Sequence, residues 1–99
     1  MVTVVTRVRI KGGQEAEWDE TFTERVHAAR EQQGFEFVQL CKPHDLPAER
    51  VIVGTWQTRD DWRAWRDDET FQETRRRLEE VDEEQESSDW YEVVVEERR

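Results

Sequence analysis

The sequence predicts an α+β fold of the ferredoxin-like type, βαββαβ, with an antiparallel sheet. Two observations carry this prediction. Four segments are rich in β-branched or alternating apolar residues, and two segments between them place apolar residues at helical spacing. The chain has 99 residues, which suits one domain with a thin core. We therefore expect residues 1–99 to form a single domain, with both helices on one face of the sheet.

The first strand and the first helix are expected over residues 2–11 and about 14–33. The first segment alternates loosely and is rich in β-branched residues, and two glycines follow it. Gly34 is a typical stop signal at the end of the helix. The apolar residues of the helix form one stripe, on which Arg25 also falls: Trp18, Phe22, Val26 and Ala29.

Residues 35–42 and 50–56 are predicted to form the second and third strands, joined by a loop that contains two prolines. Alternation along the second strand assigns Val38 and Leu40 to one face. The residues assigned to the other face are Phe35, Phe37, Gln39 and Cys41.

The stretch from Thr55 to Val81, which holds the end of the third strand and the second helical region, concentrates three of the five tryptophans within ten positions. Thr58 followed by Asp61 resembles a capping box, so a helix begins near Thr58. Trp62 and Trp65 share a face of this helix. A break is expected near Asp67, because a restart there aligns a new stripe: Phe71, Thr74, Leu78 and Val81.

The end of the chain is predicted to hold an acidic run and a fourth strand. Residues 79–88 are strongly acidic and are expected to leave the helix as a solvated loop. Residues 90–96 are expected to form the strand, with Trp90 and Val94 opposite a second set of side chains: Tyr91, Val93 and Val95.

Apolar residues on both faces of the sheet predict association of two chains. The apolar positions that suggest this are Val5, Val38, Leu40, Val93 and Val95. A monomer would expose much of this surface, and exposed patches of that kind usually mark interfaces. We expect a homodimer built sheet to sheet.

Composition excludes several classes of partner and site. The formal net charge is -10, which argues against nucleic acid or an anionic membrane surface as partner. Cys41 is the only cysteine, so no intrachain disulfide and no multi-thiolate zinc site can form. No leader and no apolar run of about 20 residues is present, and we expect a cytoplasmic protein.

Metal, phosphate and hydrolase motifs are not found either. His27 falls on the polar face of the first helix and His44 in the proline loop, and the acidic residues lack the spacing of a metal site. There is no phosphate-binding glycine loop and no nucleophile elbow. We expect no metal and no cofactor.

Taken together, several segments resemble the antibiotic biosynthesis monooxygenase family, whose members are small dimeric α+β barrels. The resemblance spans nearly the whole chain. Its residues are Phe22, Arg25, Val26, His27, Ala28, Gly34, Phe35, Gln39, Leu40, Pro43, Glu49, Arg50, Trp56, Trp65 and Phe71. It implies a ligand pocket between the sheet and the helices, and oxidation of aromatic substrates by molecular oxygen without metal or flavin.

The haem-degrading branch of the family is similar in the same segments. That branch pairs a helical tryptophan, matched here by Trp65, with a histidine haem ligand about nine residues later. Thr74 falls at the ligand position, and Thr6 falls near a position where the branch uses asparagine. Threonine is not among the usual haem ligands, which disfavours haem degradation.

The candidate binding residues each have a structural alternative. Trp65 could stack on an aromatic substrate or cover the sheet as a core ring. Thr74 could bond a ligand or its own helix, and Arg75 could hold a phenolate or carboxylate or pair with Glu79. Phe22, Trp62 and Phe71 are either pocket wall or ordinary core.

Two functions from different classes follow. The first is a cofactor-independent monooxygenase that binds a small aromatic or quinol-type substrate under Trp65, with Thr74 and Arg75 as partners of its anion. The second is a non-catalytic dimeric module, binding a small ligand or related to stress, because a fold does not fix an activity.

Overall fold

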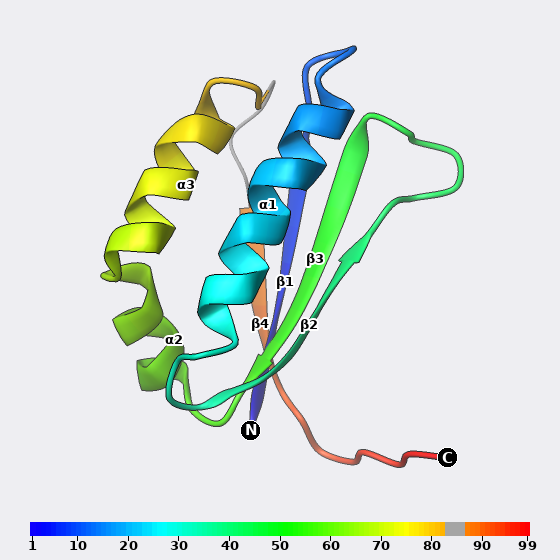
Figure 1. The fold of residues 1–99 in the computed structure, drawn as a ribbon. Helices are drawn as coiled ribbons and strands as arrows, with labels where there is room; N and C mark the ends of the chain where they lie inside the picture. Colours follow the sequence, from blue (N-terminus) through cyan, green and yellow to red (C-terminus); the bar gives the residue numbers. More distant parts are fainter. Residues whose placement is uncertain (83–86) are drawn as a thin grey trace.

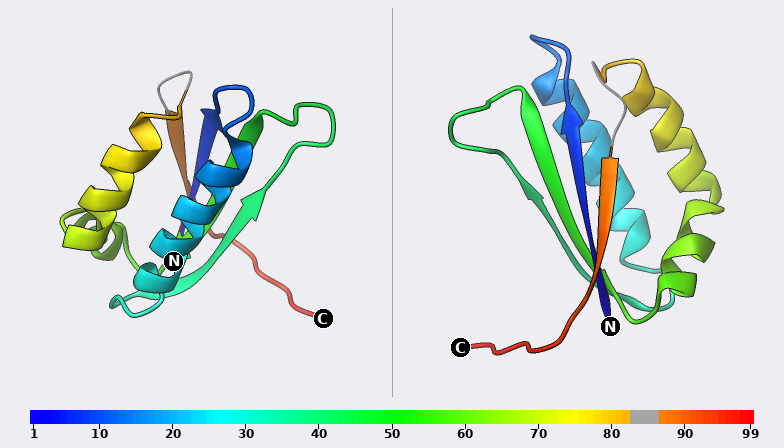
Figure 2. Two further views of the ribbon diagram at one scale, coloured as in Figure 1. Left: turned by 45° about the horizontal axis from the view of Figure 1, so that its top comes forward. Right: turned by 180° about the vertical axis from the view of Figure 1, so that it is seen from behind.

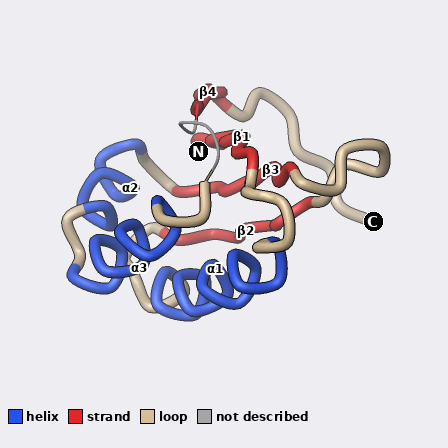
Figure 3. Tube along the Cα trace, turned by 90° about the horizontal axis from the view of Figure 1, so that it is seen from above, coloured by secondary structure: helices blue, strands red, loops and turns tan. Residues whose placement is uncertain are grey.

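The computed structural model describes residues 1–82 and 87–99, which form one antiparallel sheet covered on one face by helices (Figures 1 and 3). The order of strands in the sheet is β2-β3-β1-β4. The elements are β1 (Val2–Arg9), α1 (Glu15–Ala29), β2 (Phe35–Cys41), β3 (Glu49–Trp56), α2 (Arg59–Arg66), α3 (Glu69–Glu79) and β4 (Ser87–Glu92). The predicted ferredoxin-like α+β fold is confirmed.

The helix α1 ends earlier than predicted. It stops at Ala29, and tight turns follow in which Gln32 N–H donates to the Ala29 carbonyl and Phe35 N–H to the Gln32 carbonyl. Gly34 lies within the second of these turns and has a φ of 82°. It marks the start of β2, not the last turn of the helix.

Register determines which side chains face the helices. Val4 of β1 pairs with Gly54 of β3, and Gly54 pairs with Val38 of β2, so these residues share the inner face. Phe35 was predicted to face the same way as Phe37, and this is wrong. The register shifts between the two residues, so Phe35 turns inward and packs against the buried aromatic residues.

The predicted bounds of the fourth strand are also wrong. Instead of residues 90–96, β4 covers Ser87–Glu92, because its ladder follows β1 from Arg7 to Val2 and β1 then ends. Val93 N–H still donates to the Met1 carbonyl at 3.1 Å. Beyond it the chain leaves the edge of the sheet (Figure 2), and Val95 is 84% exposed.

The predicted break in the second helix is confirmed, and each helical piece has its own cap. Thr58 Oγ1 accepts from Asp61 N–H at 3.1 Å to begin α2. Asp68 Oδ1 accepts from Thr70 N–H at 2.8 Å to begin α3. Two capped starts ten residues apart explain why the chain turns near Asp67.

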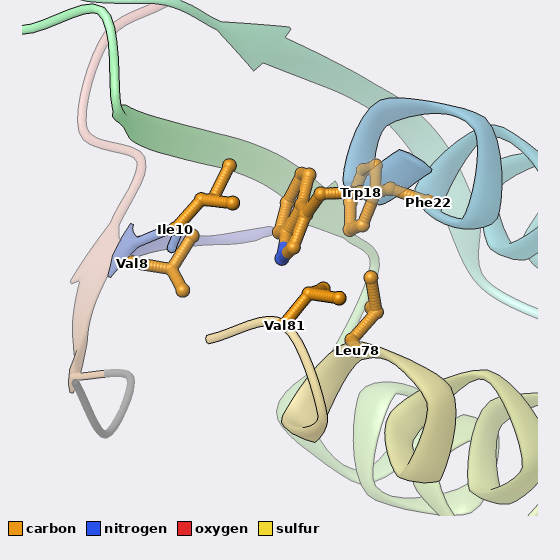
Figure 4. Close-up of a cluster of buried hydrophobic side chains, with 6 residues drawn as sticks. All are labelled: Val8, Ile10, Trp18, Phe22, Leu78 and Val81. Atoms are coloured by element: carbon orange, nitrogen blue, oxygen red, sulfur yellow. The ribbon is translucent and has the colours of Figure 1, made fainter. Parts of the chain in front are cut away.

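Buried apolar residues form two clusters under the helices. The first cluster joins α1, β1 and the end of α3, and in it the rings of Trp18 and Phe22 stack at 5.1 Å (Figure 4). Trp18 Nε1 donates to the Asp82 carboxylate at 2.8 Å, which satisfies its buried polar atom. The second cluster comprises Ala29, Trp56, Trp65 and Phe71.

An ion pair between the buried Arg50 and the partly exposed Asp19 fastens α1 to β3. The Arg50 guanidinium donates to both carboxylate oxygens of Asp19, at 2.8 and 3.0 Å, and Nη1 donates to the carbonyls of Pro47 and Glu49. The hydrogen bonds to Asp19 raise the pKa of Arg50 above its ordinary value, although burial opposes this shift. Arg50 therefore stays charged and acts as a structural clamp.

The outer face of the sheet differs from its prediction in composition. Val38 and Leu40 pack inward against the core, and Val93 and Val95 lie outside β4. The partly buried apolar residues that point outward are Val5, Val51, Val53 and Phe37.

Part of the predicted acidic run, residues 83–86, lies outside the described residues. Within the described part, no helix is long and apolar enough to cross a membrane.

Three glycine variants test how the entrance to β2 is built. A Cβ at Gly34 would overlap the Asp61 carboxylate and would also sit on a backbone with positive φ. Gly13 has positive φ but open space, and Gly12 has open space without positive φ. We expect Gly12→Ala to be near neutral, Gly13→Ala to cost about 1 kcal/mol, and Gly34→Ala to cost more than Gly13→Ala.

Urea unfolding of the three variants at one pH measures these differences. A Gly34→Ala variant as stable as Gly13→Ala would mean that the Asp61 side chain can move aside without a loss of stability. In that case the contacts of Asp61 with Thr58 and Gly34 would not hold α2 in place.

Candidate functional site

A small cavity lies between the inner face of the sheet and the three helices. Its volume is about 70 Å³. The lining residues are Val4, Thr6, Phe22, Arg25, Val26, Ala29, Phe35, Val38, Ile52, Gly54, Trp56, Trp62, Trp65 and Phe71. Most of these are apolar, and Gly54 has no side chain, which leaves space in the middle of the sheet face.

Aromatic rings form the end of the cavity near α2. Trp65 is buried and packs edge-on against Phe71 at 5.5 Å, while Trp56 packs edge-on against Phe35 at the same centroid distance. Trp62 is only partly buried and meets Trp90 of β4 at 4.5 Å. The helix break is what brings Trp65 and Phe71 together, because one continuous helix would point them apart.

Arg25 brings a buried positive charge to this apolar wall. Its side chain comes from α1, and Nε donates to Thr74 Oγ1 at 3.0 Å. Nη2 donates to the Phe71 carbonyl at 3.4 Å, and the guanidinium carbon lies 4.1 Å from the centroid of the Phe71 ring. These contacts hold the guanidinium at the cavity, where low polarity strengthens its attraction for an anion.

The predicted binding residues divide into three groups. Phe22, Trp62, Trp65 and Phe71 line the cavity. Thr74 lies behind the wall: its hydroxyl interacts with the carbonyls of Thr70 and Phe71 and accepts from Arg25. Arg75 lies outside the cavity, and its Nε donates to Glu79 at 3.2 Å. Thr74 therefore bonds its own helix and Arg75 pairs with Glu79, which are the structural alternatives given for these two residues above.

The lining does not suit haem. No His, Cys, Met or Tyr lines the cavity in the part of the chain that the structure describes, and the Thr74 hydroxyl is engaged by its own helix and Arg25. His27 and His44 are both exposed, as predicted. Across residues 1–82 and 87–99, no group of three His, Cys, Asp or Glu side chains is placed to hold a metal ion.

The model of the antibiotic biosynthesis monooxygenase family matches residues 1–77. The chain belongs to this family. No functionally curated protein matches the chain in sequence. The family membership agrees with the resemblance drawn from the order of Phe22, Gly34, Trp56, Trp65 and Phe71.

Solved structures support the fold of this family member. A Nitrosomonas europaea protein provisionally named an antibiotic biosynthesis monooxygenase superposes with a TM-score of 0.91 at 14% identity, over 94% of this chain and 89% of that one. SnoaB, a cofactor-independent oxygenase from Streptomyces nogalater, superposes with a TM-score of 0.85 at 20% identity, over 96% of this chain and 94% of that one. Rv0793 from Mycobacterium tuberculosis superposes with a TM-score of 0.87 at 15% identity, over 96% of each chain. At these identities the likeness shows the fold alone.

Arg25 is a charged residue of the cavity wall that was not among the predicted binding residues. A signal existed, since a charged residue on the apolar stripe of a helix must be buried with partners. Its partners lie 49 and 46 residues away along the chain, on α3. Spacing within one helix therefore could not identify what Arg25 contacts.

The link between Thr74 and Arg25 leads to a stability prediction. Thr74→Val keeps the shape of the side chain but removes the acceptor that Arg25 Nε uses, so we expect a loss of about 1–3 kcal/mol. Thr23→Val is the matched control, because Thr23 also bonds its own helix but is exposed. Urea unfolding of both variants compares the losses. Equal losses would show that Arg25 does not depend on Thr74.

Proposed function

We propose that this family member is a cofactor-independent monooxygenase acting on a small aromatic or quinol-type substrate. The observation that carries the proposal is the Arg25 guanidinium in the wall of an apolar, indole-lined cavity. An acidic C–H or O–H of an electron-rich ring ionises more readily beside a fixed positive charge. The name of SnoaB, a cofactor-independent oxygenase of the same fold, supports this choice.

For a substrate with a ring methylene, the overall reaction converts the CH2 group and molecular oxygen into a ring carbonyl and water. The methylene loses one proton to solvent, and the resulting anion transfers electrons to molecular oxygen. One oxygen atom becomes the carbonyl oxygen, and the second leaves as water with two hydrogens, which balances the two lost from the methylene. Arg25 stabilises the anion, and the apolar wall excludes water from the reacting carbon.

The size of the cavity limits what binds without movement. Ligand pockets usually have volumes of about 300–1,000 Å³, whereas this cavity has about 70 Å³. Trp62 is the wall residue that is both partly exposed and linked to the surface through Trp90. Rotation of the Trp62 side chain is the simplest way to admit a ring, and it leaves the buried Trp65 in place.

A specific observation favours a second candidate, a non-catalytic dimeric module that binds a small hydrophobic ligand or is related to stress. No histidine, carboxylate or thiol lines the described cavity, so no side chain there is an obvious general base. In this case Arg25 would hold the anionic or polar end of a ligand without turnover. Oxygen consumption separates the two candidates.

The enzymatic test measures oxygen uptake with a panel of anthrones and quinols. We expect a rate above the buffer blank for at least one compound, and a loss of about 100-fold for Arg25→Met, comparable to removal of one oxyanion donor. Arg25→Lys retains the charge and should recover part of the rate. Arg30→Met is the control, since Arg30 is an exposed residue just after α1.

Circular dichroism and urea unfolding must first show that each variant is folded. A wild-type rate equal to the buffer blank with every compound, and unchanged in Trp65→Ala, would refute the monooxygenase and favour the binding module.

We also propose that two copies associate through the outer face of the sheet, in a cytoplasmic homodimer. The partly exposed residues Val5, Val51 and Val53 would be covered in such a dimer. Sedimentation equilibrium should give twice the chain mass of 12.0 kDa. Val53→Glu should produce a monomer, whereas Arg76→Glu on the exposed side of α3 should not. A monomeric wild type would refute the dimer.

A further inference from the structure

A second hollow lies on the surface next to the cavity and has the opposite character. It has a volume of about 520 Å³ and lies where α2, the start of α3 and β4 meet. We call it the arginine groove and define it by its lining: Arg59, Trp62, Arg63, Arg66, Asp67, Gln72, Arg75, Ser88 and Trp90. Among the described residues, four arginines and one carboxylate line this groove, on a chain whose net charge is -10.

Two of the four arginines are held by aromatic rings. The guanidinium carbon of Arg59 lies 4.6 Å from the Trp90 ring centroid, and that of Arg66 lies 4.8 Å from the Trp62 ring centroid. Arg63 pairs with Asp60 and Arg75 with Glu79. Among the described residues, no carboxylate pairs with Arg59 or Arg66.

Each of these two guanidinium carbons lies over an indole ring, a contact that attracts the cation without using a carboxylate. Guanidinium groups that stack flat on aromatic rings keep the N–H groups of their edges available for hydrogen bonds. Those edges match the two oxygens of a carboxylate. The indole rings of Trp62 and Trp90 also offer apolar area to a flat ring beside that carboxylate.

Trp62 connects the groove to the inner cavity, because its ring lines both. A ligand that displaced Trp62 could place a ring toward Trp65 while an attached charge stayed among the arginines outside. The cavity alone is too small for such a ligand, whereas the two spaces together are in the usual range for a ligand pocket.

We propose that the arginine groove binds the carboxylate of an aromatic acid, and that Arg59 and Arg66 are its specificity-determining residues. That this acid is also the substrate rests on the proposed function, but binding of the acid does not require turnover. The groove then selects aromatic compounds with an anionic substituent over neutral ones of the same shape.

The test compares 2-naphthoate with the neutral 2-naphthol at pH 7 by titration calorimetry. We expect the Arg59→Gln/Arg66→Gln double variant to bind naphthoate about tenfold more weakly or worse, with naphthol affinity unchanged. Arg76→Gln carries the same substitution on an exposed part of α3 outside the groove, and it should bind both compounds like the wild type. Arg59 and Arg76 are exposed and Arg66 is partly buried, so all variants should remain folded, which circular dichroism checks before each titration.

Two further measurements locate the bound anion. Raising the salt concentration should weaken the binding of naphthoate and leave the binding of naphthol unchanged, because only naphthoate carries a charge that the arginines attract. Trp90→Phe should reduce the quenching of tryptophan fluorescence by naphthoate.

Three results would overturn the proposal: no binding of naphthoate by the wild type, equal affinity in the double variant, or displacement of naphthoate by equimolar inorganic phosphate. Binding of naphthoate as expected, without oxygen uptake for any compound, would refute the monooxygenase and leave the groove assignment standing.

Discussion

The packing of Arg25 between α1 and α3 is the interaction on which both the fold and the candidate site depend. A buried guanidinium loses its hydration, and this cost is offset only if its N–H groups find acceptors. Thr74 and the Phe71 carbonyl provide acceptors, and the Phe71 ring provides a face. Thr74 can accept because its own proton is directed to carbonyls of α3. The same contacts that join the helices therefore leave a positive charge at the cavity.

The break between α2 and α3 is the second constraint, and it explains the shape of the cavity. A straight helix through residues 59–79 would place Trp65 and Phe71 about 120° apart around the helix axis. Asp68 caps a new helix instead, and the indole of Trp65 meets the Phe71 ring under the sheet. Phe71 in turn carries the ring and the carbonyl that Arg25 uses, so the placement of the break also fixes the placement of the charge.

Patterns among residues close together in the sequence were sufficient to predict the fold. The site depends on contacts between residues far apart in the sequence, which such patterns do not show. The caps at Thr58 and Asp68 and the apolar stripes depend on residues two to four positions apart, so they can be found from one chain segment. The bounds of β4 depend instead on the end of β1, the strand with which it pairs. The inward orientation of Phe35 depends on its pairing with β3. Arg25 was visible on the apolar stripe, but its partners were not, because they come from a different helix.

The arginine groove shows how far net charge limits the choice of ligand. A charge of -10 spread over the surface repels a long polyanion, which must lie against many carboxylates at once. A small carboxylate in the groove is affected mainly by the charges close to it, because charges beyond about 8–10 Å are largely screened at ordinary ionic strength. Among the described residues of the groove, Arg63 and Arg75 are paired with carboxylates, whereas Arg59 and Arg66 lie over indole rings. The acidic composition therefore argues against nucleic acid, and it is compatible with an aromatic acid bound beside Trp62.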